Sequence, residues 1–507
     1  MPVISEILSL INSGRANDIK HFSENGDDVQ AAQLKSLLNK AQNTTIGKNC
    51  GFSSIKNIRE FKDRVPVEDY EDLMPQVIQL RQGEKNLLWP GKINWFAKSS
   101  GTTSSKSKFI PISKDSLNDC HYQGGRDTFI IYQSLYQETK LFTGKTLILG
   151  GSQEINSFSN NSVYGDLSAI LIDNMPFWAN FFRTPDKDIA LMDDWEKKMK
   201  LITETTVKEN VTALAGVPSW LLVLLKQILK TTGKANLLEV WPNLELFVHG
   251  GVNFSPYREQ YKELIPSEEM NYLETYNASE GFFAIQNDFS SPGMLLMLDY
   301  GIFYEFMPLS QLGKENPKTL ELNEVELGTD YAMIITTNGG LWRYLIGDTV
   351  RFTSKNPYKI TVSGRTKHFI NAFGEEVIID NAEKALEKAC KETGAIIKEY
   401  TAAPIFMVGD VKGAHQWLIE FEKMPQNEKS FIEILDKTLQ EINSDYEAKR
   451  YKGMTLTEPT LSIARKELFF DWLKSKNKLG GQNKVPRLAN NREYMDDLIE
   501  LNGQSCT

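Results

Sequence analysis

The segment from Ser99 to Lys108, SSGTTSSKSK, has the composition of a phosphate-binding loop. Its backbone N–H groups and seven hydroxyls can donate hydrogen bonds to phosphate oxygens, and its two lysines add positive charge. Gly101 lets the backbone approach a ligand without a clash from a Cβ atom. The alternative is a solvated linker rich in Ser and Thr. Apolar residues on both sides favour a loop held between two strands over a linker.

A second candidate is YNASEG, Tyr276 to Gly281. The tyrosine could stack on a nucleobase, and Glu280 is a hard oxygen ligand of the kind that Mg²⁺ prefers. Considered alone, the segment fits the ordinary end of a strand better than a binding motif.

A third candidate is LWRYLIGDTVRF, Leu341 to Phe352. Gly347 frees the backbone at a bend beside Asp348. A carboxylate has only acceptors, so it pairs well with the two donor hydroxyls of a ribose. The alternative is a structural ion pair between Arg343 and Asp348.

The fourth candidate is SGRTKHFINAFGEEV, Ser363 to Val377, where the pattern of the chain changes. Arg365 and Lys367 in this segment could also be solvated charges of a linker.

Several common chemistries lack their motifs. The sequence has no G-x-S-x-G elbow, no HExxH or Cys/His zinc cluster, and no G-x-G-x-x-G fingerprint. Gly144-Lys145-Thr146 resembles the end of a Walker A loop, but Thr139 stands where that loop needs a glycine. The five histidines are scattered along the chain.

Composition narrows the function classes further. The chain has 507 residues, enough for two or three domains, and a net charge of −9, which argues against nucleic acid or an anionic membrane as the main partner. The N-terminal residues lack the basic start of a signal peptide, and the most apolar stretch, 211–229, is broken by Gly and Pro and predicts a buried strand and helix. No pair of cysteines has metal or disulfide spacing, which suits free thiols in the cytoplasm (Cys50, Cys120, Cys390 and Cys506).

The elements that must position these motifs fall into two unequal parts. After a helical start, short apolar runs bounded by turn residues predict a mixed α/β region, with a tight hairpin turn at Asn338-Gly339-Gly340. After Gly364 the order changes to approximately β-α-β-β-α-β, which suggests a small ferredoxin-like α+β domain. Its elements are a strand at 369–373, a helix from its N-cap Asp380 to Gly394, strands near 395–408 and 416–423, a helix near 428–442 and a strand near 454–463.

Taken in order, the four motifs resemble those of the auxin-responsive-promoter type of acyl-acid amido synthetases. This family belongs to the adenylate-forming superfamily, with acyl-CoA synthetases and firefly luciferase. Near the C-terminus, GGQNKVPRL is similar to the lysine-bearing segment of these amido synthetases. The resemblance spans nearly the whole chain. One departure is Ser104, where the wider superfamily usually has glycine and the amido synthetases vary.

The resemblance implies an α/β fold with a large adenylate-forming N-terminal domain of mixed sheets flanked by helices (residues 1–366) and a small, mobile α+β C-terminal domain (367–507). Lys367 would be the hinge position. It also implies ATP and Mg²⁺ as cofactors.

Roles for individual residues follow from the same resemblance. Those along the ATP phosphates would be Ser99, Ser100, Gly101, Thr102, Thr103 and Lys108. Those around the nucleoside would be Tyr276 and Ser279, with Gly250 and Gly251 lining the adenine slot and Asp348 and Arg365 at the ribose. The catalytic group would be Lys484, Lys108, Thr102 and Glu280, with Glu280 as the metal ligand and Lys484 as a mobile lysine. The acyl pocket would include Val217, Pro218 and Trp220, although Pro218 and Trp220 also fit a core.

The expected reaction joins a small carboxylic acid to an amine, expected to be an amino acid, with release of pyrophosphate and AMP. The expected protein is cytoplasmic, a monomer or weak homodimer, and binds neither nucleic acid nor membrane. Two alternatives stay open: an adenylate-forming enzyme whose acceptor is a thiol such as coenzyme A, and a nucleotide-binding protein that no longer catalyses.

Overall fold

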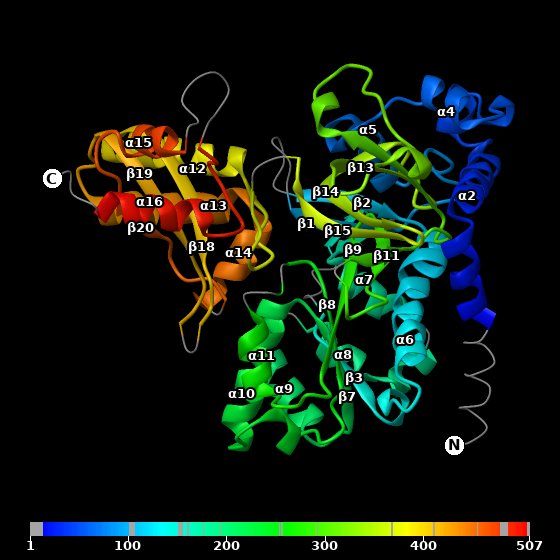
Figure 1. Cartoon of the computed structure of the whole chain (residues 1–507), viewed down its shortest axis with the longest axis horizontal. Coiled ribbons are helices and arrows are strands. Elements are labelled where there is room, and N and C mark those ends of the chain that lie inside the picture. Colours follow the sequence, from blue (N-terminus) through cyan, green and yellow to red (C-terminus); the bar gives the residue numbers. More distant parts are fainter. Residues whose placement is uncertain are drawn as a thin grey trace.

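The computed structural model describes residues 14–503 except 101–106, 151–155, 160–161, 176, 193, 253, 255–256, 292, 367–368, 409–410, 454 and 477–484. The chain forms a large part, which holds everything up to β15, and a smaller part built from residues after 368 (Figure 1). Within the described ranges, no helix combines the length and the apolar composition that a membrane span requires.

The large part is organised by an eleven-stranded sheet in the order β12-β13-β14-β15-β11-β10-β9-β8-β7-β3-β6. The strands β3, β6, β7, β8 and β9 pair in parallel, whereas β9 to β15 pair antiparallel. β9 therefore belongs to both halves. The strands are β3 (Lys145–Ile148), β6 (Arg183–Thr184), β7 (Val211–Gly216), β8 (Leu246–His249), β9 (Asn271–Ala278), β10 (Gly281–Ile285), β11 (Met294–Leu296), β12 (Ile302–Pro308), β13 (Asp330–Thr337), β14 (Tyr344–Lys355) and β15 (Tyr358–Arg365).

A second, four-stranded sheet carries the ends of the predicted phosphate loop. Its order is β2-β1-β5-β4, with β1 (Trp95–Ser100), β2 (Ser107–Ile112), β4 (Asn156–Ser159) and β5 (Ser162–Gly165). β1 and β2 pair antiparallel up to Ser100 and Ser107, so the two strands predicted on either side of the loop are present.

Helices cover both sheets of the large part. They are α2 (Gly26–Ala41), α3 (Thr45–Asn49), α4 (Ile58–Arg64), α5 (Tyr70–Arg81), α6 (Gln123–Leu135), α7 (Leu167–Asn174), α8 (Lys187–Ala190), α9 (Trp195–Thr206), α10 (Pro218–Thr232) and α11 (Arg258–Leu264). β7 and α10 are the buried strand and helix predicted for 211–229. The connection from β13 to β14 is a hairpin, but it spans 338–343 and is longer than the predicted tight turn.

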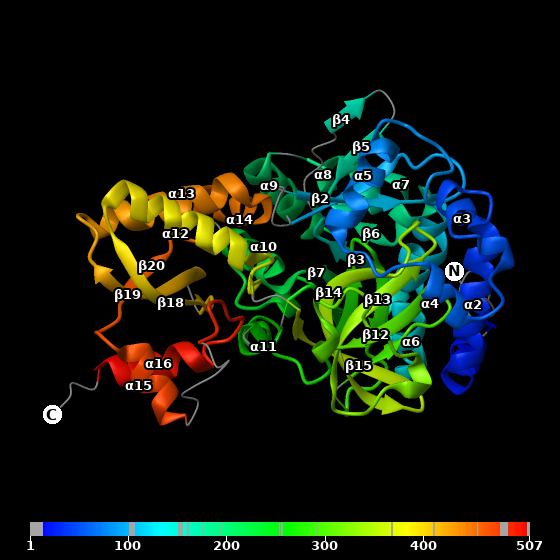
Figure 2. The same cartoon turned by 90° about the horizontal axis from the view of Figure 1, so that it is seen from above.

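The smaller part contains the three-stranded sheet β18-β19-β20 between two layers of helices. Figure 2 shows α12 and α13 on one face of this sheet and α15 and α16 on the other. Its elements are α12 (Ile379–Thr393), β18 (Ile396–Ile405), β19 (Ala414–Lys423), α13 (Glu428–Ile442), α14 (Ser444–Arg450), β20 (Thr460–Ile463), α15 (Leu468–Ser475) and α16 (Glu493–Gly503). The predicted fold class, a large α/β part with mixed sheets and a separate α+β part, is confirmed.

Two details of the smaller part differ from the prediction. The strand predicted at 369–373 is only β16 (Phe369–Ile370), and it pairs with β17 (Val377–Ile378) outside the three-stranded sheet. The reason is local, because the buried Glu375 carboxylate accepts hydrogen bonds from the N–H groups of Ala372 and Phe373 and turns the chain back. α12 begins before the predicted cap Asp380, and the Asn381 side chain accepts from the N–H of Ile378 instead.

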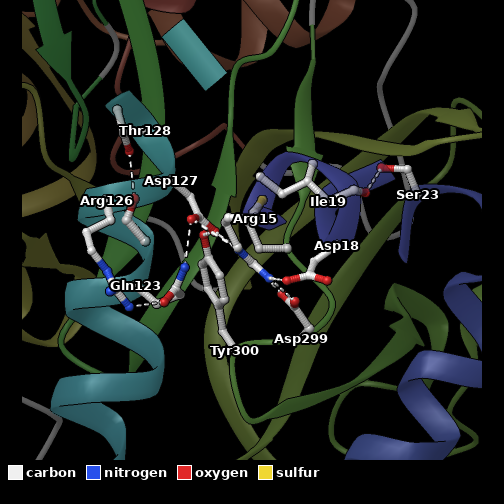
Figure 3. Close-up of polar contacts among 12 residues, drawn as sticks. Arg15, Asp18, Ile19, Ser23, Gln123, Arg126, Asp127, Thr128, Asp299 and Tyr300 are labelled. Carbon is white, nitrogen blue, oxygen red and sulfur yellow. Dashed lines mark hydrogen bonds and ion pairs between the residues drawn. The ribbon is translucent and has the colours of Figure 1, made fainter. Parts of the chain in front are cut away.

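A buried charge network anchors the helical residues 14–24 to the rest of the large part (Figure 3). The Arg15 guanidinium donates to Asp127 of α6, with Nη2 to Oδ2 at 2.7 Å, and to Asp299, with Nη2 to Oδ1 at 2.9 Å. The Tyr300 hydroxyl and the Gln123 amide also donate to Asp127, whose side chain is fully buried. Removing the arginine would leave this carboxylate buried without its cation.

We predict that Arg15→Met lowers the free energy of unfolding by about 3 kcal/mol, the typical cost of breaking a buried ion pair by removing one partner. Urea denaturation followed by circular dichroism measures the change. Lys20→Ala, an exposed position on the same helical segment, is the control and should change stability by less than about 0.5 kcal/mol. Equal stability of both variants would show that the network contributes nothing.

Candidate functional site

The centre of the candidate site is the carboxylate of Asp348 on β14, which is 7% exposed. The Tyr276 hydroxyl, from the end of β9, donates to one carboxylate oxygen at 2.7 Å. Arg365 Nε, from β15, donates to the other oxygen at 2.7 Å. The β14–β15 register places Asp348 directly opposite Arg365, so the sheet itself builds this contact. Burial and the nearby Asp348 hold the pKa of Tyr276 well above its ordinary value, so the phenol stays a donor.

The alternative ion pair between Arg343 and Asp348 is wrong. Arg343 is buried and binds Glu305 of β12 through two nitrogens, each at 2.9 Å from a carboxylate oxygen. Its Nη1 also donates to the backbone carbonyl of Val65 at 2.7 Å. Arg343 therefore ties β12 to the N-terminal helices, and Arg365 is the partner of Asp348.

Arg365 also joins the sheet to the segment that leads into the smaller part. Its Nη2 donates to Glu376 Oε1 at 2.6 Å, and its guanidinium lies 4.8 Å from the ring centroid of Phe369. Glu376 is a functional candidate that sequence analysis did not single out, although it stands inside the quoted fourth motif. Nothing in the local pattern predicts a partner for it eleven positions away.

Glu280 lies in the two-residue turn between β9 and β10, because Ala278 and Gly281 are paired across the hairpin. Ser279, the other turn residue, is half-buried, as is Glu280. Burial raises the pKa of Glu280 to about 7; the ammonium of Lys108 opposes this rise, and the carboxylates of Asp348 and Glu376 add to it. The structure thus places Glu280 and Lys108 in the electrostatic neighbourhood of Asp348.

Lys108 comes from β2, where it pairs with Ser99 across the hairpin. Its ammonium lies 5.9 Å from the ring centroid of Tyr70, and the Tyr70 hydroxyl accepts a hydrogen bond from the N–H of Phe109 at 2.7 Å. Both ends of the predicted phosphate loop therefore lie on the four-stranded sheet.

The structure requires glycine at Gly250 and Gly251, the pair that follows β8. A Cβ on Gly250 would lie 2.4 Å from the Thr275 carbonyl oxygen, and Gly251 has φ +80°. Glycine at these positions lets the chain pass close to β9, one residue before Tyr276. Lining of an adenine slot by this pair stays a prediction.

The residues predicted for the acyl pocket gather at the start of α10. Val217 precedes the helix, Pro218 occupies its first turn and is buried, and Trp220 is half-buried. The Pro218 carbonyl accepts a hydrogen bond from the Tyr261 hydroxyl at 2.8 Å, which ties this end of α10 to α11.

Several predicted residues lie outside the described residues, namely Gly101, Thr102, Thr103, Lys367 and Lys484. Ser100 is placed at the end of β1, but its side chain is not described. In the described ranges, no group of three or more His, Cys, Asp or Glu side chains has the geometry of a metal site.

Comparison with known proteins identifies three domain models along the chain. The GH3 family N-terminal domain matches residues 15–270, the GH3 family central domain 295–365 and the GH3 family C-terminal domain 380–493. A curated relative, the indole-3-acetic acid-amido synthetase GH3.4 of Arabidopsis thaliana, is 24% identical over 92% of this chain and 90% of its own.

Two solved structures share the fold. The AtGH3.15 acyl acid amido synthetase in complex with 2,4-DB has 18% identity and a TM-score of 0.62, covering 97% of this chain and 96% of that one. A 2-hydroxyisobutyryl-CoA ligase in complex with 2-HIB-AMP and CoA has 14% identity and a TM-score of 0.58, covering 95% and 93%.

The raised pKa of Glu280 makes a prediction about stability. An acid whose pKa is higher in the folded state stabilises the fold below its ordinary pKa and loses that contribution as pH rises through the folded value. For Glu280 the pH window over which this contribution is lost runs from about pH 4.5 to about pH 7. As pH rises across this window, the free energy of unfolding of Glu280→Gln should increase relative to that of wild type. Above the window, the difference between the two proteins should stay constant.

Urea denaturation of the ligand-free protein at half-unit steps from pH 4.5 to pH 8 measures this difference. Glu24→Gln, at an exposed position, is the control and should follow wild type throughout. A pH-independent difference between Glu280→Gln and wild type would contradict the burial of this carboxylate.

Proposed function

Because the chain belongs to the GH3 family, we propose that it is an ATP-dependent acyl-acid amido synthetase. A carboxylate oxygen of the substrate acid attacks the α-phosphorus of ATP, pyrophosphate leaves and an acyl-adenylate forms. The nitrogen of an amine then attacks the acyl carbon, the bond from that carbon to the AMP oxygen breaks, and the products are an amide and AMP.

The observation that carries this proposal is the hydrogen-bonded carboxylate of Asp348. Each of its oxygens accepts one bond from the protein, from Tyr276 or from Arg365. Each oxygen keeps a further acceptor position, so the carboxylate can accept from two neighbouring hydroxyls, as the ribose of ATP presents. The two protein donors hold the carboxylate in one orientation before the nucleotide arrives.

Lys108 and Glu280 are suited to the triphosphate. Lys108 supplies a positive charge at the end of the loop predicted to hold phosphates. Mg²⁺ is commonly held by one or two carboxylates together with substrate phosphates, and it would offset the charge that develops on the phosphoryl oxygens. The desolvated carboxylate of Glu280 fits such a cation, since a cation would favour its charged form.

The remaining site roles are proposals that rest on the family motifs. Ser99, Ser100, Gly101, Thr102 and Thr103 would donate to the ATP phosphates. Lys484 would enter the site during adenylation. The proposed domains are 1–366 and 367–507, with rotation about Lys367 changing the site between the two half-reactions. These proposals require no protein nucleophile, because positioning and charge supply the catalysis.

The proposed adenylation step predicts an exchange reaction that needs no amine. Carboxylic acids that are substrates should drive exchange of labelled pyrophosphate into ATP in the absence of any amine. A matrix of acids and amines, read by AMP release and product mass, then identifies both substrates. Stimulation of AMP release by coenzyme A but by no amine would assign a thiol acceptor instead. Tight ATP binding without exchange across the acid panel would mean a protein that does not catalyse.

Asp348→Asn should weaken ATP binding by about tenfold or more, because a charged acceptor contributes roughly 1.5–3 kcal/mol per hydrogen bond. Isothermal titration calorimetry with ATP and Mg²⁺ measures the affinity, and circular dichroism checks the fold. Asp330→Asn is the matched control, since Asp330 forms an ion pair with Arg351 on the same sheet, outside the proposed site. Unchanged ATP affinity in Asp348→Asn would rule out the ribose role.

A further inference from the structure

The turn at residues 371–376, which joins β16 to β17, contacts the proposed nucleotide site through its last residue. Glu376 Oε1 accepts a hydrogen bond from Arg365 Nη2 at 2.6 Å. The same guanidinium donates through Nε to Asp348, the carboxylate proposed to bind the ribose. The position of Glu376 therefore bears on the direction from which Arg365 reaches Asp348.

The first residues of the turn also contact the large part. The Asn371 amide donates to the carbonyl of Gly251 at 3.4 Å, in the glycine pair predicted to line the adenine slot. The carbonyl of Ala372 accepts a hydrogen bond from the Tyr257 hydroxyl at 2.8 Å. The turn is thus bound to the large part at both of its ends.

The backbone of the turn has a conformation that needs support from other contacts. Glu376 has φ +38° and Gly374 has φ +88°. A residue with a side chain rarely adopts such a left-handed backbone, and it keeps that backbone only where its surroundings hold it. The N–H of Glu376 donates to the side-chain oxygen of Asn371 at 3.3 Å, and its carbonyl accepts from the Asn443 amide at 3.0 Å. The placement of the Glu376 carboxylate depends on how firmly the whole turn is held.

The centre of this support is Glu375, whose side chain is fully buried. Its two carboxylate oxygens accept from the N–H groups of Ala372 and Phe373, at 3.2 and 2.6 Å. A third contact comes from His415 of β19, whose Nε2 lies 2.8 Å from Oε1. Because a carboxylate has only acceptors, Nε2 carries the hydrogen of this bond. The imidazole is therefore the side-chain donor that replaces water at this buried carboxylate.

His415 is well placed to act as a rigid support. It lies in β19, directly opposite Pro404 of β18, and its side chain is fully buried. Its ring centroid is 5.4 Å from that of Tyr446 on α14. Its other nitrogen, Nδ1, has no hydrogen-bond partner in the part of the chain that the structure describes. The hydrogen bond from Nε2 to Glu375 is thus the polar interaction for which this ring is positioned.

We propose that His415 is a positioning residue for nucleotide binding. Its hydrogen bond to Glu375 fixes the turn, and the turn places Glu376 against Arg365. The affinity for ATP, a ligand of the large part, then depends on a side chain in the three-stranded sheet of the smaller part. The inference rests on the proposed function, since it takes ATP as the ligand beside Arg365.

Two variants of the full-length protein, His415→Met and His415→Gln, form a matched pair. Both side chains are unbranched and similar in length, but only glutamine has an amide that can donate to Glu375. In calorimetric titration with ATP and Mg²⁺, His415→Met should bind about fivefold more weakly than wild type. His415→Gln should recover most of this loss. Unchanged affinity in His415→Met, or an equal loss in the two variants, would overturn the proposal.

Tyr446→Phe is the control for a general loss of stability. It removes the hydrogen bond from the Tyr446 hydroxyl to the buried Asp436, 2.7 Å long, beside His415, and leaves Glu375 and its donors in place. Urea denaturation should show that it lowers the free energy of unfolding, whereas its ATP affinity should stay within about twofold of wild type. A loss of ATP affinity as large as that of His415→Met would mean that His415 acts only through stability.

A double-mutant cycle tests the route through Glu376. If His415 acts through this residue, the variant that combines His415→Met with Glu376→Gln should bind ATP no more weakly than Glu376→Gln alone. Losses that multiply would contradict this route and with it the inference, while the proposed function would stand. Absence of ATP binding in wild type would instead overturn the proposed function together with the role of His415.

Discussion

The candidate site depends on supplying hydrogen-bond donors to one buried carboxylate. Asp348 is 7% exposed, and burying a carboxylate costs free energy unless donors replace the water it loses. The donors come from two other strands, Tyr276 of β9 and Arg365 of β15, so the contact can form only when β9, β14 and β15 have assembled in the main sheet. Arg365 then extends the network to Glu376, beside the smaller part.

The two parts meet through contacts of two different kinds. Near α11 the contact is apolar and tightly packed, with the Tyr257 hydroxyl donating to the Ala372 carbonyl at 2.8 Å and its ring 6.4 Å from that of Phe406. Near α14 it is charged, with Lys449 over Trp220 and Lys452 paired to Glu196. Burial of apolar surface favours one arrangement of the two parts. Half-buried charged side chains can replace a protein neighbour by a ligand at a smaller cost in free energy.

Most of the architecture could be predicted from local patterns. The strands around the predicted phosphate loop, the helix at 218–232 and the αL residue Gly394 that ends α12 follow from apolar periodicity and from turn residues, which act over a few positions. Where side chains override the local pattern, prediction failed. The Glu375 carboxylate bends the chain by hydrogen bonding to it, so the predicted strand is only a short two-stranded ribbon. This carboxylate is itself hydrogen bonded by His415 Nε2 at 2.8 Å, from a strand forty residues later.

The sequence by itself determined the fold class and the family, because these depend on residue types and spacing within short segments. It did not determine which arginine neutralises Asp348. Arg343 is closer in the chain, but its left-handed backbone, at φ +43°, and the buried Glu305 take it to β12, and the β14–β15 register supplies Arg365 instead. Likewise, Lys449 has no motif that marks it. Only the packing of α14 against α10 brings Lys449 over the ring of Trp220, because such contacts are set by whole elements and not by neighbours in sequence.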